Sequence, residues 1–113
     1  MASTQNLSYT RNTTYTMTIN YSNANGIAGK TAMFTVKPTQ YDSTANDSTA
    51  ILQKDVTLTN NTGNLVINPA DIPDTVTPQT YYYDIKVLDT SGAIYQIAQG
   101  NFVLSAWPTN RET

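Results

Sequence analysis

The feature that most constrains the fold of this chain is an alternating run of side chains that begins at Tyr81 and ends at Asp89. Successive side chains of a β-strand point to opposite faces, so the larger apolar residues of this run share one face. That face carries Tyr81, Tyr83, Ile85 and Val87, and the opposite face carries Tyr82, Asp84 and Lys86. The run therefore predicts a strand with one buried face.

A turn signal follows this strand directly. Residues 90–92, with the sequence Thr-Ser-Gly, suit a three-residue hairpin loop whose glycine takes the left-handed conformation. This loop predicts a register in which Val87 lies opposite Tyr95 and Ile85 lies opposite Ile97. Apolar side chains then meet on one face of a half-buried antiparallel hairpin.

The rest of the chain repeats short alternating runs that are separated by turn signals. We expect further strands at residues 14–21, 31–36, 56–58 and 65–67, and in the segment that ends near 105. Their inward side chains are Tyr15, Met17, Ile19, Tyr21, Ala32, Phe34, Val36, Val56, Leu58, Leu65, Ile67, Phe102 and Leu104. Gly100 interrupts the last strand, and we expect it to form a β-bulge that restores the inward phase of the residues after it.

These patterns predict an all-β chain, folded as an immunoglobulin-like antiparallel β-sandwich of six to eight strands. A length of 113 residues is that of one domain. Residues 1–13 are expected to form an amino-terminal arm or edge strand, residues 14–105 the β-sandwich, and residues 106–113 a carboxy-terminal tail. The segment 69–72 could form a single helical turn.

Composition excludes several classes of function. The chain has no cysteine and no histidine, so disulfides are excluded, soft metal centres lack their usual ligands, and no cofactor is expected. Charged residues make up 12% of the chain and the net charge is −2, which leaves no basic patch for nucleic acid or an anionic membrane. No apolar run is long enough to span a membrane, and the first five residues lack the pattern of a signal peptide.

Two short motifs are similar to catalytic motifs, but the sequence in and around each of them argues against catalysis. Residues 24–31 follow a phosphate-binding loop pattern without its first glycine, but a strand rather than a helix is expected after them. Residues 89–92 resemble the catalytic turn of aspartic proteases, but Ser91 breaks the spacing of that motif. The chain holds a single glutamate, Glu112, so acid–base catalysis would depend on isolated aspartates in turns. We therefore expect no enzymatic activity.

Three side chains are predicted to contact other proteins: Tyr82, Trp107 and Arg111. Tyr82 is an aromatic residue on the outward face of a strand, where few charges surround it. Trp107 is the single tryptophan, and it either anchors the chain on a neighbouring subunit or caps the open end of its own sandwich. Arg111 follows in the carboxy-terminal tail.

Several segments together resemble small immunoglobulin-like virion proteins of tailed bacteriophages. They are residues 29–36, the run Thr80-Tyr81-Tyr82-Tyr83-Asp84-Ile85, the turn 89–92, and Gly100-Asn101-Phe102-Val103. The same pattern is similar to the amino-terminal domain of phage baseplate upper proteins. The chain departs from that family in its long loop 39–50 and in the segment 77–79, where the family has a glycine before its tyrosine.

This resemblance implies a non-enzymatic structural protein of a bacteriophage virion, assembled in the cytoplasm of the bacterial host. Its role would be that of a capsid decoration (cement) protein or of a baseplate or tail-fibre attachment module. The implied partners are other virion subunits of the capsid or of the tail and baseplate, and copies of itself, without nucleic acid or membrane. The alternative is a carbohydrate- or host-receptor-binding β-sandwich module that presents Tyr82 and loop 39–50.

Overall fold

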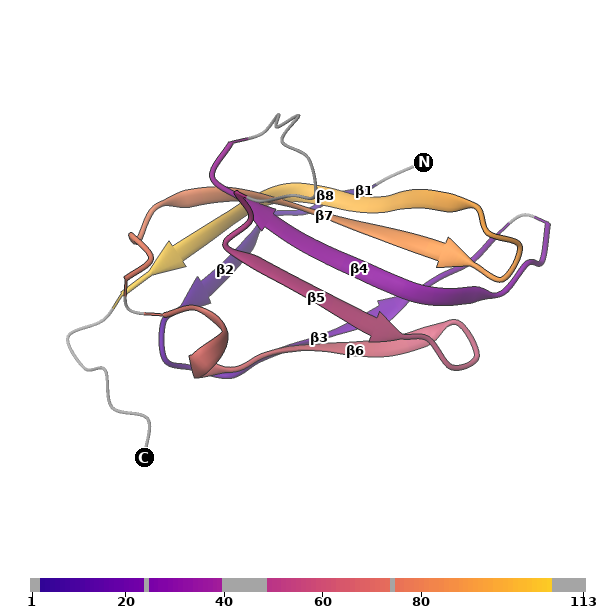
Figure 1. Ribbon diagram of the computed structural model, residues 1–113, viewed down its shortest axis with the longest axis horizontal. Coiled ribbons are helices and arrows are strands. Elements are labelled where there is room, and N and C mark those ends of the chain that lie inside the picture. The colour runs from indigo at the N-terminus through magenta and orange to yellow at the C-terminus, as the bar shows by residue number, and fades with distance from the viewer. Residues whose placement is uncertain (1–2, 24, 40–48, 74, 107–113) are drawn as a thin grey trace.

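The computed structural model describes residues 3–23, 25–39, 49–73 and 75–106, which form two β-sheets packed face to face (Figure 1). The larger sheet has the strand order β1-β8-β7-β4-β5, with β2 also paired to β8, and the smaller sheet pairs β3 with β6. The strands are β1 (Ser3–Thr4), β2 (Leu7–Thr10), β3 (Tyr15–Asn20), β4 (Gly29–Lys37), β5 (Leu52–Thr57), β6 (Thr62–Ile67), β7 (Thr80–Asp89) and β8 (Ile94–Ser105). A short 3₁₀ turn, η2 (Pro69–Asp71), lies at the expected position of a helical turn.

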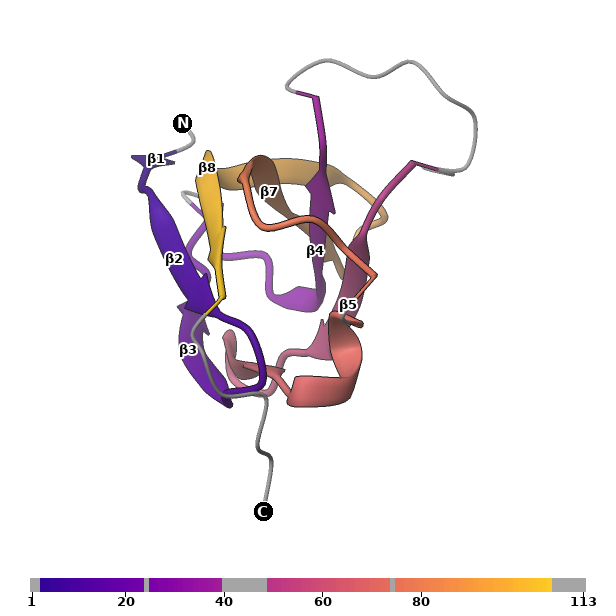
Figure 2. The ribbon, with the colours of Figure 1, turned by 90° about the vertical axis from the view of Figure 1, so that its left-hand side faces the viewer.

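This arrangement confirms the predicted immunoglobulin-like β-sandwich. Strands β4, β7 and β8 pair antiparallel in one sheet and β3 pairs with β6 in the other, while β5 extends the larger sheet as in variable-type domains. The end view in Figure 2 shows β2 beside β8 at one side of the sandwich, with β4 and β5 at the other. Within the described ranges, no helix is long and apolar enough to cross a membrane.

A tyrosine corner, which is a hallmark of immunoglobulin-like domains, stands at the start of β7. The hydroxyl of Tyr81 donates a hydrogen bond of 2.6 Å to the backbone oxygen of Thr77, four residues upstream. Burial raises the pKa of this tyrosine above its ordinary value, against the opposing effect of the Arg11 charge. The corner ties the connection from η2 to the strand that runs through the middle of the larger sheet.

The predicted inward side chains form the core between the sheets. Phe34 lies at its centre, with ring-centroid distances of 5.6 Å to Tyr83 and 6.2 Å to Phe102. The predicted residues that are buried are Ile19, Tyr21, Ala32, Phe34, Val36, Leu58, Leu65, Ile67, Tyr81, Tyr83, Ile85, Val87, Phe102 and Leu104. Tyr15, Met17 and Val56 are partly buried against them.

The amino-terminal segment belongs to the larger sheet and to the core. Strand β2 runs parallel to β8, with Leu7 opposite Phe102 and Tyr9 opposite Leu104. Leu7 and Tyr9 are both buried, and the ring of Tyr9 stacks on that of Phe102 at 6.2 Å. The polar composition of residues 1–13 concealed this contribution, because only two alternate positions in the segment carry large apolar side chains.

One part of the predicted hairpin register is correct and the other is wrong. Val87 lies opposite Tyr95 as predicted, but Ile85 lies opposite Ala98 rather than Ile97. Ile97 is the extra residue of a β-bulge, and its side chain is partly buried against the core. The turn alone set the predicted register, and a turn specifies pairing only as far as the first irregularity of the ladder.

The predicted bulge at Gly100 is therefore also wrong. Gly100 pairs regularly with Tyr83, and the bulge at Ile97 already places Phe102 and Leu104 on the inward face. The glycine has a different role, because a Cβ at this position would lie 2.2 Å from the backbone oxygen of Gln5. Gly100 allows the chain between β1 and β2 to approach β8 closely.

Candidate binding face on the larger sheet

The outward face of the larger sheet carries a regular grid of mostly polar side chains from β4, β7 and β8. Residues of these strands that lie opposite one another form three successive rows across the sheet. The rows are Lys37–Tyr82–Asn101, Thr35–Asp84–Gln99 and Met33–Lys86–Gln96. Directly opposite residues have Cβ atoms about 4.5–5.5 Å apart, so the nine side chains form one continuous surface.

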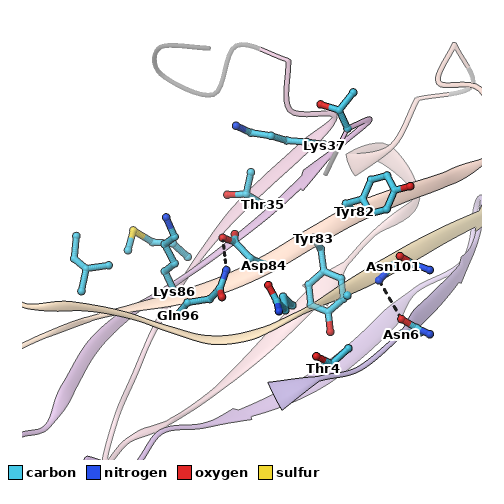
Figure 3. A pocket seen from close by; sticks show the side chains of 15 residues that line it. Thr4, Asn6, Thr35, Lys37, Tyr82, Tyr83, Asp84, Lys86, Gln96 and Asn101 are labelled. Atoms are coloured by element: carbon cyan, nitrogen blue, oxygen red, sulfur yellow. Dashed lines mark hydrogen bonds between the residues drawn. The ribbon is translucent and has the colours of Figure 1, made fainter. Parts of the chain in front are cut away.

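A hollow of about 790 Å³ lies over this grid (Figure 3). Its volume falls within the range of about 300–1,000 Å³ that is typical of small-molecule sites. Thr4 and Asn6 line its amino-terminal side, where the amide oxygen of Asn6 accepts a 3.1 Å hydrogen bond from the backbone N–H of Asn101. A smaller hollow of about 280 Å³ shares Met33 and Thr35 and continues the face over β5.

The grid offers hydrogen-bond donors, acceptors and one aromatic side chain to a ligand. Figure 3 shows Tyr82 on the same side of the sheet as Lys37 and Thr35, as their register requires. The Nε2 atom of Gln96 donates a 3.2 Å hydrogen bond to Oδ2 of Asp84, across the strands β8 and β7. This contact orients a carboxylate at the centre of the hollow.

The floor of the hollow is anchored to the amino-terminal segment. Tyr83 points inward from β7, and its hydroxyl donates a 2.5 Å hydrogen bond to the backbone oxygen of Gln5. Burial, as the main cause, raises the pKa of Tyr83 above its ordinary value. The backbone N–H of Gln5 also donates to the oxygen of Gln99, which fixes the edge of the hollow against β8.

The bulge at Ile97 builds this face. Gln96 and Gln99 are three positions apart, so in a regular strand they would point to opposite faces. The extra residue between them brings both side chains outward, opposite Lys86 and Asp84. The sequence pattern predicts one extra residue in this strand but places it at Gly100, which would leave Gln99 on the inward face, so it misses this pair.

Of the three predicted interface residues, the described part of the chain contains Tyr82. Tyr82 is half-buried on the outward face, where it lines the hollow. Trp107 and Arg111 lie outside the described residues, as does most of loop 39–50.

The two catalytic-looking motifs have structural roles. Lys30 and Thr31, the end of the phosphate-loop pattern, belong to strand β4, so no helix follows them. Asp89 is buried in the hairpin turn, where its Oδ1 atom accepts hydrogen bonds from Ser91 Oγ at 2.6 Å, Ser91 N at 2.9 Å and Ala93 N at 3.0 Å. The Ser91 hydroxyl first, and then these backbone N–H groups, lower the pKa of Asp89 against the opposing effect of burial.

The end of the β7–β8 hairpin exposes two adjacent large apolar side chains. Ile94 is 58% exposed and Tyr95 is 45% exposed. Ile94 lies at the end of the hollow, whereas Tyr95 begins the inward phase of β8 beyond the edge of the core. The hairpin end thus presents apolar surface on both of its sides.

Comparison with known proteins finds only a distant likeness in shape. No protein-family model matches the chain, and no curated protein matches it. Murine CRIg is similar with a TM-score of 0.42 and 13% identity, over 90% of this chain and 92% of that one. A 2,6-sialyltransferase of Vibrionaceae Photobacterium sp. JT-ISH-224 is similar with a TM-score of 0.35 and 11% identity, over 93% of this chain and 18% of that one. Likenesses this distant carry no functional argument, so the immunoglobulin-like assignment stands on the strand order and the tyrosine corner.

Proposed function

We propose that this chain is a non-enzymatic structural protein of a tailed-bacteriophage virion, where it acts through protein–protein contacts. Its place would be that of a capsid decoration protein or of a baseplate or tail-fibre attachment module. The segments that carry the family resemblance lie in β4, in β7, in the hairpin turn and in β8, which are neighbours in the larger sheet. The resemblance therefore concerns one continuous part of the fold rather than scattered residues.

The observation that carries an assembly role is the exposed pair Ile94 and Tyr95. These are the large apolar side chains that the described residues expose most, at 58% and 45%. Aromatic residues are enriched at the centres of protein interfaces, where a few of them supply most of the binding free energy. Because adjacent residues of a strand point to opposite faces, a partner that covers both must enclose the hairpin end.

The hairpin end is held in one conformation, which favours binding. The backbone N–H of Asp89 donates to the oxygen of Ala93, and the N–H of Thr90 donates to the oxygen of Ala28 in the loop before β4. Together with the side-chain contacts of Asp89, these bonds fix the turn before any partner arrives. A fixed turn loses little conformational entropy on binding, so more of the contact free energy appears as affinity.

Three aspartates have structural contacts that support a role without catalysis. Asp71 forms a 2.7 Å ion pair with Lys54, and Asp84 accepts a hydrogen bond from Gln96. Asp89 serves the hairpin turn. Each of these carboxylates stabilises a local structure, and general acid–base chemistry needs a group that is free to exchange its proton with a substrate.

The test is to look for this chain in particles of the phage whose genome encodes it. We expect mass spectrometry of purified particles to detect the chain in many copies, and electron cryomicroscopy to show its sandwich with the hairpin end against a neighbour. Rebinding to particles that lack the chain should fall at least about tenfold for Tyr95→Ser. Tyr82→Ser, a tyrosine on the opposite face of the same hairpin, is the matched control and should rebind normally.

Two outcomes would contradict this proposal. Absence of the chain from intact particles rejects the virion role. Normal rebinding of Tyr95→Ser together with loss for Tyr82→Ser rejects the hairpin end as the contact and assigns it to the outward face.

A further inference from the structure

We propose that the hollow over β4, β7 and β8 is a binding site for a neutral oligosaccharide. This inference goes beyond the assembly role and does not depend on it: the two sites share Ile94, but the assembly role is tested at Tyr95 and the hollow at Tyr82 and Asn101. The site comprises the three rows of the grid, together with Thr4 and Asn6 at its edge.

The polar groups of the hollow have the chemistry that sugar hydroxyls require. A hydroxyl both donates and accepts hydrogen bonds, and an amide side chain offers an acceptor oxygen and a donor NH₂ at neighbouring positions. Four amide side chains line the hollow, and threonine hydroxyls of β1 and β4 stand beside them. The amides are those of Asn6, Gln96, Gln99 and Asn101.

Tyr82 supplies the apolar part of such a site. It lies in one row between Lys37 and Asn101, so an aromatic side chain is flanked on both neighbouring strands by hydrogen-bonding groups. A pyranose ring matches this arrangement, because it has an apolar face of C–H groups that is surrounded by hydroxyl groups. Packing of that face against the tyrosine leaves the hydroxyls directed toward the flanking side chains.

The site exists before a ligand binds. Gln96 already holds Asp84, Asn6 already holds the backbone of Asn101, and paired strands carry every row of the grid. Side chains on paired strands are positioned more precisely than those on loops. Because these side chains are already held in place, binding costs less conformational entropy than it would at a site built from flexible amide side chains.

The composition of the hollow favours a sugar over other partners. The centres of protein interfaces are apolar and depleted in charge. The described lining of this hollow is instead mostly polar, with Met33, Ile94, Tyr82 and Tyr83 as its large apolar or aromatic side chains. A nucleic-acid site requires several cationic side chains along a groove. Among the described residues, the charged side chains of this lining are Lys37, Lys86 and Asp84, so one negative charge offsets two positive ones. One net positive charge suits a neutral ligand better than a polyanion.

The experiment is a screen of the purified full chain on an array of neutral and acidic oligosaccharides of bacterial cell-wall and capsule type. The oligosaccharide with the strongest signal is then titrated into labelled protein by NMR. We expect binding to neutral sugars, with shifts confined to residues of β4, β7 and β8 that line the hollow. Tyr82→Ala and Asn101→Ala should each weaken the affinity about tenfold or more.

Tyr95→Ser is the matched control, because Tyr95 lies on the same hairpin and does not line the hollow. It should bind the sugar like the unaltered chain. Circular dichroism and thermal melting check that each variant folds, and Asn101→Ala is an exposed substitution that tests the site even if Tyr82→Ala unfolds.

Three results overturn the proposal: no binding to any neutral sugar, binding that Tyr82→Ala and Asn101→Ala both leave unchanged, or binding to acidic sugars alone that salt abolishes. Each is separable from the virion role, which is tested by the presence of the chain in purified particles and by the rebinding of Tyr95→Ser.

Discussion

Ile85 lies opposite Ala98 in the ladder between β7 and β8, and the residue before Ala98 is the extra one of a β-bulge. This single irregularity has two consequences. It turns Phe102 and Leu104 into the core, and it brings Gln96 and Gln99 together on the outward face. The core and the candidate sugar site therefore depend on the same extra residue.

Deletion of Ala98 should leave a folded protein. The deletion removes the extra residue and moves Ile97 opposite Ile85, so all pairing on either side of the bulge keeps its register. We expect a loss of about 1–3 kcal/mol from altered packing, measured as the free energy of unfolding in urea.

Deletion of Gly100 is the matched control, with the opposite expectation. If the bulge at Ile97 is kept, Phe102 and Leu104 point to solvent; if the bulge is lost, Gln99 takes the place of Gly100, where a Cβ would lie 2.2 Å from the Gln5 oxygen. Either way the chain should be much less stable than the Ala98 deletion. A folded Gly100 deletion together with an unfolded Ala98 deletion would contradict the position of the bulge.

Tyr81→Phe should destabilise the protein by about 1–2 kcal/mol. The substitution removes the hydroxyl that donates to the Thr77 oxygen at 2.6 Å and leaves that oxygen without its tyrosine donor, while the ring still fills its place in the core. Chemical denaturation measures the change. Tyr95→Phe at the exposed hairpin end is the control, and an equal effect for both variants would show that the tyrosine corner contributes nothing specific.

Lys54 joins β5 to β6 and to η2, and a double-mutant cycle should detect this connection. Its Nζ atom donates to the Val66 oxygen at 2.9 Å and lies 2.7 Å from Oδ2 of Asp71. Because both side chains are about one-quarter exposed, we expect a coupling free energy of about 1 kcal/mol between Lys54→Met and Asp71→Asn. Strictly additive effects of the two substitutions would contradict a direct interaction.

The protein should lose stability in acid below about pH 4. The pKa of Asp71 is lowered because Lys54 and the Asn68 N–H together outweigh the opposing effect of burial, and the pKa of Asp89 is lowered by its turn. A carboxylate with a lowered pKa binds fewer protons in the folded chain than in the unfolded chain. Its stabilisation is therefore present above the ordinary value of 3.8 and is lost as the pH falls through the folded pKa.

Urea unfolding between pH 7 and pH 2 measures this dependence. Asp89→Asn should be less stable than the unaltered chain at pH 7, and the difference should shrink as the pH falls, because protonation removes the same charge. A difference that stays constant over this range would show that the carboxylate charge does not stabilise the turn.

Much of the fold could be predicted because the relevant signals are local. Alternation along β4 identified Ala32, Phe34 and Val36 as core, and the structure buries all three. Asn60 and Asn61 lie between the predicted strands 56–58 and 65–67, and both adopt positive φ in the turn there, which asparagine tolerates better than most residues. These signals depend on residues a few positions apart, so they are independent of how the rest of the chain folds.

The candidate site could be predicted only in part. Tyr82 was recognised as an outward aromatic residue, but its neighbours Lys37 and Asn101 come from strands far away in the sequence. Which side chains of different strands stand opposite one another depends on register, and register is decided by packing across the whole sheet. Without it, the outward residues remain separate positions rather than a hollow.

The sequence by itself determined the inward and outward faces of each strand and the positions of the main turns, because a period of two and turn chemistry act locally. The tertiary structure decided where β8 holds its extra residue, why Gly100 must be small, and that β2 closes the core. These features depend on contacts such as Gly100 against Gln5 and Leu7 opposite Phe102, which join residues about 95 positions apart. No local pattern records contacts of that range, since they form only when the amino-terminal segment pairs with β8 at the other end of the chain.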